Sequence, residues 1–199
     1  MVLVAPGGLG PEVTPAIRAI TMPGFHQLMG LVTLPVARQL TGAGLRVLAG
    51  TGVSALRDLD EVAEIVDSFK DPRSRRAIRH VVSAVVDWRG QIVTMADRAY
   101  LTEAMPMCVI WGTDDAVIPV RHAGIVAELA PAATVEVIAN AGHFPHKDHP
   151  QRFVRIVDEF IRTHPAASYH RGRWRTLLRN GRQTPLPEAV TPAHQAEIA

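Results

Sequence analysis

The sequence predicts an α/β fold with a parallel sheet, and two observations carry this prediction. Three short apolar runs, at residues 2–5, 107–111 and 135–139, are rich in β-branched side chains. The first two have no polar alternation, which is typical of strands buried on both faces of a parallel sheet. The second and third runs are each followed by turn residues and then by helical periodicity, the strand and helix alternation of parallel α/β domains.

The interval between the first two strands is about 100 residues long, far more than a single crossover helix needs. Its apolar spacing predicts three helices, over residues 28–40 with a bend at Pro35, over 55–69 and over 73–86. Pro72 directly precedes the last of these and suits a helix start. A helical insertion in a parallel sheet typically covers the carboxyl ends of the strands, so we expect residues 13–89 to form a lid.

The second half of the chain repeats the strand and helix alternation. A helix is predicted over residues 120–129, and an apolar stripe at i, i+3, i+4 spacing predicts an amphipathic helix through Phe153, Ile156, Val157, Phe160 and Ile161. The segment from residue 164 contains four prolines and scattered arginines, so we expect one short helix near 173–178 in an otherwise flexible tail. The predicted division is a core at 1–12 and 90–163, a lid at 13–89 and a basic tail at 164–199.

Composition excludes several classes of protein. The chain has 199 residues, of which 47% are hydrophobic and 20% charged, with one cysteine, Cys108. A single cysteine forms neither an intramolecular disulfide nor a cysteine-rich metal cluster, so we expect a cytoplasmic protein. No apolar stretch reaches the roughly 18–20 residues of a membrane span. Residues 163–199 hold five arginines and two glutamates, a net charge of +3, whereas the remainder carries −1, so no basic face for nucleic acid is expected.

Two motifs follow the second and third predicted strands. W-G-T-D-D-A-V-I-P occupies residues 111–119, and A-G-H-F-P occupies residues 141–145. At this spacing and in this order they resemble the carboxyl-terminal part of α/β-hydrolase-fold enzymes. A-P-G-G-L-G at 5–10 is similar to the segment that leads into the lid in the branch of meta-cleavage-product (carbon–carbon bond) hydrolases and related esterases. The resemblance covers residues 1 to about 163.

The resemblance implies a catalytic triad in the chain order nucleophile, acid, histidine. By motif position, it implies that Asp115 is the acid and His143 the base. The neighbouring Asp114 is the alternative acid, or both carboxylates only cap the turn before Pro119, and the alternative for His143 is a structural histidine. In the triad, His143 would take the proton of a nucleophilic hydroxyl and return it to the leaving group, while Asp115 would fix the imidazole tautomer. Both residues lie just beyond predicted strands, where parallel sheets place their sites.

Further residues are candidates for substrate contact. Phe25, His26 and Met29 belong to an apolar group in the predicted lid, which either lines a substrate pocket or packs against the core. Trp88 lies on the return from lid to core, where the resembled hydrolases commonly place a substrate-side residue. Cys108 and Trp111 lie on the predicted central strand, where core packing accounts for both.

A metal site is the weaker interpretation of the histidine-rich segment after the third strand. Its candidate ligands are His143, His146, Asp148 and His149. Pro145 and Pro150 indicate a loop there, and the pattern H-E-x-x-H is absent, so we expect neither a metal nor another cofactor.

The nucleophile motif of the resembled family, G-x-S-x-G, is absent from the 199 residues. In those enzymes the nucleophile lies upstream of the matched segment, so we expect a truncated chain that is inactive alone. The complete enzyme is expected to hydrolyse an ester or a carbon–carbon bond of a small apolar molecule. The alternative is a non-catalytic remnant or binding module that keeps the lid pocket and pairs with a separate amino-terminal half. The unpaired edge of the strand at 2–5 also predicts self-association.

Overall fold

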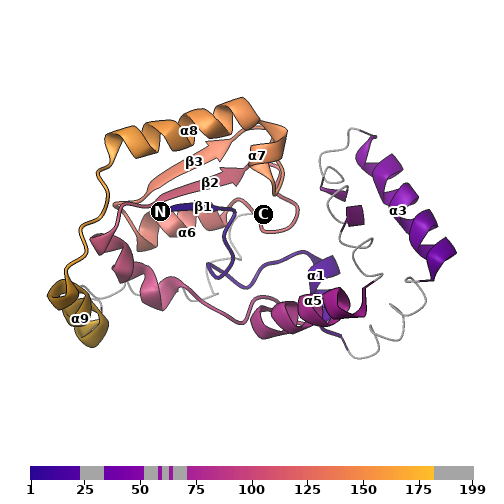
Figure 1. Cartoon of the computed structure of the whole chain (residues 1–199), viewed down its shortest axis with the longest axis horizontal. Helices are drawn as coiled ribbons and strands as arrows, with labels where there is room; N and C mark the ends of the chain where they lie inside the picture. The colour runs from indigo at the N-terminus through magenta and orange to yellow at the C-terminus, as the bar shows by residue number, and fades with distance from the viewer. Residues whose placement is uncertain (23–33, 52–57, 60–62, 65–70, 182–199) are drawn as a thin grey trace, which may run out of the picture.

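A three-stranded parallel sheet forms the centre of the molecule (Figure 1). The computed structural model describes residues 1–22, 34–51, 58–59, 63–64 and 71–181. The strands follow the order β1 (Val2–Val4), β2 (Cys108–Gly112) and β3 (Thr134–Ile138). Both pairings are parallel, with Leu3 opposite Val109 and Ile110 opposite Glu136. The predicted parallel α/β fold is therefore confirmed, and each strand lies within one residue of its expected position.

Strand β2 is buried on both faces, because a helix layer covers each side of the sheet (Figure 1). On one side lies α8 (Pro150–Thr163), and on the other lie α6 (His122–Leu129) and the 3-10 helix η2 (Ala96–Ala104). Side chains of β2 alternate between the two layers, as the pleat of a strand requires. Cys108 and Ile110 pack with Ile156 and Phe160 of α8, and Val109 and Trp111 pack with Ala123 and Val126 of α6.

The amphipathic helix α8 confirms the predicted stripe, with one difference. Ile156 and Phe160 are buried, whereas Ile161 is 64% exposed and does not belong to the core. Helix α5 (Pro72–Val85) lies within one residue at each end of the helix predicted over 73–86, and Pro72 forms its first residue. Asp71 caps it by accepting hydrogen bonds from the backbone N–H groups of Arg73 and Ser74, because the first turn of a helix has no internal acceptors for these donors.

Three described helices between β1 and η2 lie past the carboxyl ends of the strands (Figure 1). They are α1 (Pro15–Ile20), α3 (Pro35–Ala49) and α5, and they belong to the inserted segment. Pro35 starts α3 and does not bend a helix, which corrects the expectation for 28–40, since proline fits the first helical position without losing a hydrogen bond. Residues 28–33 and most of the helix predicted over 55–69 lie outside the described residues.

The two ends of the inserted segment are joined by Gln91. Its side-chain oxygen accepts from the Gly8 N–H at 2.6 Å, and its side-chain amide donates to the carbonyl oxygen of Glu12 at 2.8 Å. Its own backbone N–H donates to Pro11 at 2.9 Å. The chain therefore enters and leaves the inserted segment at one point beside the sheet.

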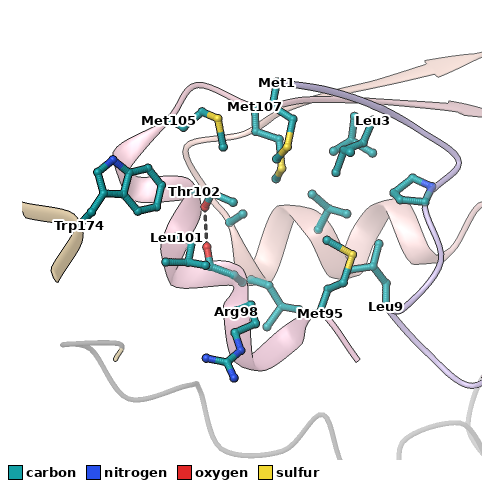
Figure 2. Close-up of a pocket in the computed structure, with 16 residues that line it drawn as sticks. Met1, Leu3, Leu9, Met95, Arg98, Leu101, Thr102, Met105, Met107 and Trp174 are labelled. Carbon is teal, nitrogen blue, oxygen red and sulfur yellow. Dashed lines mark hydrogen bonds between the residues drawn. The ribbon is translucent and has the colours of Figure 1, made fainter. Parts of the chain in front are cut away.

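The carboxyl-terminal segment contains a helix longer than predicted, α9 (Arg171–Asn180). It contacts η2, and Trp174 is the side chain that reaches toward it (Figure 2). Residues 182–199 lie outside the described residues. No described helix is long and apolar enough to cross a membrane. Within the described residues β1 pairs with β2 alone, so self-association through its other edge stays a prediction.

Candidate active site

The loops that follow β2 and β3 lie against each other at the carboxyl edge of the sheet. Gly112 permits this approach, since a Cβ atom there would lie 2.2 Å from the carbonyl oxygen of Ala141 and 2.3 Å from that of Gly142. The Asp114 N–H donates to the Ala141 carbonyl at 2.9 Å, and the Asn140 N–H donates to the Thr113 hydroxyl at 2.9 Å. These contacts fix the relative positions of the two predicted motifs.

Asp115 and His143 meet across this junction. Oδ2 of Asp115 lies 2.9 Å from Nδ1 of His143, and the Asp115 side chain is fully buried whereas that of His143 is 20% exposed. With Nδ1 bonded to a carboxylate, the imidazole presents its basic lone pair at Nε2. The Asp114 carboxylate instead accepts from the Thr113 hydroxyl at 2.9 Å. The arrangement suits a histidine that takes and returns protons.

The loop that carries Asp115 is braced by its own backbone and by the core. Oδ1 of Asp115 accepts from the N–H groups of Val117 and Ile118, each at 2.9 Å. The Trp111 ring is fully buried, and its Nε1–H donates to the Ile118 carbonyl at 3.0 Å. Trp111 is a core residue, as predicted, and its hydrogen bond to Ile118 links the loop that carries Asp115 to the core.

Two further carboxylates hold the backbone of the His143 loop. Asp58 Oδ2 accepts from the His143 N–H at 3.0 Å, and Asp148 Oδ2 accepts from the Gly142 N–H at 2.7 Å. Burial raises the pKa of Asp58 above the usual aspartate range, even though the hydrogen bond and charge of His143 lower it. Sequence reasoning missed Asp58, because no local pattern marks a residue that is 85 positions away from its partner.

The remaining predicted site residues are not brought to this pair within the described structure. Phe25, His26 and Met29 lie outside the described residues. Trp88 is 64% exposed, with the Arg89 guanidinium 4.6 Å from its ring centre, so its predicted contact with substrate stays a prediction.

Two further features of the sequence are the histidine-rich segment after β3 and the core cysteine Cys108. Among the described residues, no group of three or more histidine, cysteine or carboxylate side chains is arranged to hold a metal ion. The His149 ring nitrogen contacts the Asn140 carbonyl at 3.1 Å. Burial raises the pKa of the Cys108 thiol, which disfavours the reactive thiolate at this core position.

The sequence analysis also missed a contact between a buried histidine and a carboxylate. His122 is completely buried, and its Nε2 lies 2.7 Å from Oε2 of Glu12, which also pairs with Arg121 at 3.2 Å. The contact joins the loop after β1 to the start of α6. This histidine lies in the scaffold and does not join the pair formed by Asp115 and His143.

An apolar cavity of about 260 Å³ lies apart from these residues, between the sheet, η2, α6 and Trp174 (Figure 2). Met1 and Met107, at the amino ends of β1 and β2, form part of its wall. The Thr102 hydroxyl is turned to the carbonyl of Ala99 at 2.6 Å. Because its walls lack acid–base side chains other than Arg98, the cavity offers packing and no proton-transfer chemistry.

Comparison with known proteins agrees with this architecture. An uncharacterized protein of Mycobacterium tuberculosis is 41% identical over 184 residues, which cover 91% of this chain and 54% of that protein. The chain thus spans about half the length of this protein and of two further mycobacterial relatives with the same identity and coverage. A pimeloyl-[acyl-carrier protein] methyl ester esterase of Serratia marcescens is 34% identical over 76 residues, 37% of this chain and 30% of that protein.

Solved structures share the fold at low sequence identity. A meta-cleavage product hydrolase from Pseudomonas fluorescens superposes with a TM-score of 0.52 and 19% identity, over 82% of this chain and 55% of that one. The sequence model of the Alpha/beta hydrolase family matches residues 1–156, which include all three strands and both loops of the site. On this match, together with the parallel sheet and its paired loops, the chain belongs to the alpha/beta hydrolase family.

Proposed function

We propose that this chain carries the acid and the base of a hydrolase triad, with Asp115 as the acid and His143 as the base. The observation that carries the proposal is their 2.9 Å contact across the loops of two neighbouring parallel strands. The buried Asp115 carboxylate and the partly exposed His143 ring fit an acid held in the protein and a base open to a reactant.

The roles follow from the chemistry of the pair. Nε2 of His143 takes the proton of a nucleophilic hydroxyl as that oxygen attacks the substrate, and the resulting imidazolium gives the proton to the leaving group. Asp115 stabilises the imidazolium through Nδ1 without taking the proton itself. Its other oxygen is occupied by two backbone N–H groups, which keep the carboxylate oriented toward the ring.

The proposed reaction is hydrolysis of an ester or of a carbon–carbon bond in a small apolar molecule. Local similarity to the Serratia marcescens methyl ester esterase supports the ester. The inserted helices lie past the carboxyl ends of the strands, which supports a lid function for residues 13–89 (Figure 1).

The nucleophile, in this proposal, lies outside the 199 residues. No serine of the sequence stands in the G-x-S-x-G pattern. The chain alone is then inactive, because loss of the nucleophile from a serine triad costs on the order of 10⁶ in turnover. The same absence favours the second candidate, a non-catalytic binding module that keeps the inserted helices.

One experiment separates the two candidates. The reading frame upstream of the Met1 codon is translated, and a product that contains G-x-S-x-G is assayed with short-chain nitrophenyl esters and a serine-directed fluorophosphonate probe. We expect labelling of the extended product and none of the 199-residue chain. His143→Ala and Asp115→Asn should each lower kcat about 10³-fold or more. Full activity of either variant, or labelling of the short chain, contradicts the proposal, and an upstream frame without the motif favours the binding module.

A further inference from the structure

His143 is held through its backbone as well as through its ring. Its N–H donates to Asp58 Oδ2 at 3.0 Å, while its Nδ1 contacts Asp115 at 2.9 Å. Asp58 belongs to the inserted segment and is only 8% exposed. Two carboxylates from distant parts of the chain therefore hold His143, one at its backbone N–H and one at its ring.

Gly142 makes the approach of Asp58 sterically feasible. A Cβ atom on residue 142 would lie 2.6 Å and 2.8 Å from the two carboxylate oxygens of Asp58, closer than real Cβ atoms come to other atoms. The glycine of the G-H motif therefore leaves the space that the carboxylate fills. Burying a carboxylate costs free energy unless hydrogen bonds compensate it, and here the His143 N–H supplies one.

Burial opposes the ionisation of Asp58. Burial raises the pKa of its carboxyl most, and the nearby carboxylates of Asp115 and Asp148 raise it further, whereas His143 lowers it. The contact with the His143 N–H is thus formed against an electrostatic cost.

We propose that Asp58 is a positioning residue for His143, which links the inserted segment at this residue to the placement of the base. The inference rests on the proposed function, since positioning matters to catalysis only where His143 is the base. When Asp58 withdraws, the His143 N–H loses its carboxylate acceptor, and the loop keeps only the contacts made by Asp148, Asp115 and the Asp114 N–H. A misplacement of about 1 Å in a catalytic group costs on the order of 10²-fold in rate.

The test follows two protons of His143 by NMR in the folded 199-residue chain, the backbone amide proton and the ring Nδ1 proton. We expect Asp58→Ala to accelerate the exchange of both with water about tenfold or more, because a charge-assisted hydrogen bond is lost at the amide and the ring contact loosens. Asp58→Asn keeps an acceptor oxygen in place, so exchange should return to within about threefold of wild type. This rescue separates positioning from a general loss of stability.

Asp71→Ala is the matched control. Asp71 is an aspartate of the same inserted segment that also accepts from backbone N–H groups, at the start of α5. Its removal should leave both His143 protons unchanged. Unchanged exchange in Asp58→Ala, or equal acceleration in Asp71→Ala, overturns the inference.

If Asp58→Ala does not fold, a pH titration of the wild-type chain tests the inference. The chemical shift of the His143 amide proton should follow a carboxyl titration whose midpoint lies above the usual aspartate range. Asp115, Asp148 and the His143 ring also face this region, so the step is assigned to Asp58 by its disappearance in Asp58→Asn. Absence of the step in the wild type overturns the inference.

Turnover measurements distinguish this inference from the proposed function. In an active extended form, Asp58→Ala should lower kcat about 10²-fold while KM stays within about twofold, and Asp58→Asn should recover most of the loss. Full activity of His143→Ala refutes the proposed function. An inactive His143→Ala together with an unchanged kcat for Asp58→Ala refutes only the role of Asp58.

Discussion

Replacing Gly112 with alanine tests whether the close approach of the two site loops depends on the missing side chain. An added Cβ atom would lie 2.2 Å and 2.3 Å from two backbone carbonyl oxygens of the His143 loop. Even the weak C–H···O contacts of sheets keep carbon and oxygen about 3.3 Å apart. The loop must therefore retreat by about 1 Å, because backbone atoms cannot rotate away as a side chain does.

The size of the effect follows from two opposing contributions. Overpacking in a well-packed interior costs about 1–3 kcal/mol, and the upper end applies because both obstructing atoms belong to the backbone. Alanine restricts the unfolded chain more than glycine does, which returns about 0.5–1 kcal/mol. We expect Gly112→Ala to lower the free energy of unfolding by about 2 kcal/mol.

Urea-induced unfolding followed by tryptophan fluorescence measures this change. Gly124→Ala is the matched control, since Gly124 lies on the exposed side of α6 with no atom within 4 Å of an added Cβ. It should raise the free energy of unfolding by about 0.5–1 kcal/mol. The reasoning is refuted if Gly112→Ala unfolds within about 0.5 kcal/mol of wild type while Gly124→Ala shows its gain.

Three further predictions concern the core and the charged groups. Trp111→Phe should lower the free energy of unfolding by about 1–3 kcal/mol, because the buried Ile118 carbonyl loses its hydrogen-bond donor. Urea unfolding measures this loss, and a loss below about 0.5 kcal/mol contradicts the prediction. Because the folded-state pKa of Asp58 is raised, its contribution to stability is present below the unfolded aspartate pKa and is lost as pH rises through the folded value. The stability of Asp58→Asn should therefore fall less than that of wild type as pH rises from the unfolded aspartate pKa through the folded pKa of Asp58. Thermal melting at several pH values measures this, and the same pH dependence as wild type would refute it. The Cys108 thiol should resist a disulfide reagent in the native chain at mildly alkaline pH and react fully in urea; rapid native labelling would count against its burial.

Much of the scaffold could be predicted because its signals are local. The run at 107–111 has no polar residue, and the structure buries β2 completely between two helix layers. Pro72 marks the first turn of α5, since proline needs no hydrogen-bond acceptor there. The same local rule explains the error at Pro35, where the predicted helix continued through a proline that in fact starts one.

The short elements were harder to predict from sequence. Helix α1 and the 3-10 helix η2 were not expected. Helix α1 has six residues and η2 consists of 3-10 turns, so neither carries a clear α-helical periodicity of apolar residues. The exposure of Ile161 was missed for a different reason. Its spacing places it near the apolar stripe of α8, and only the width of the neighbouring sheet determines which members of the stripe are covered.

The sequence by itself determined the parallel strands and the two motif loops, because each depends on residues within a few positions of one another. The candidate pair Asp115 and His143 came from the resemblance of the two motifs to a known family. Tertiary structure decided how these loops meet: the missing Cβ of Gly112, the brace from Trp111 and the 2.9 Å contact of the pair. It alone revealed Asp58, whose carboxylate reaches the His143 backbone across 85 residues of chain. Such a contact depends on tertiary folding, and no local preference of either residue encodes it.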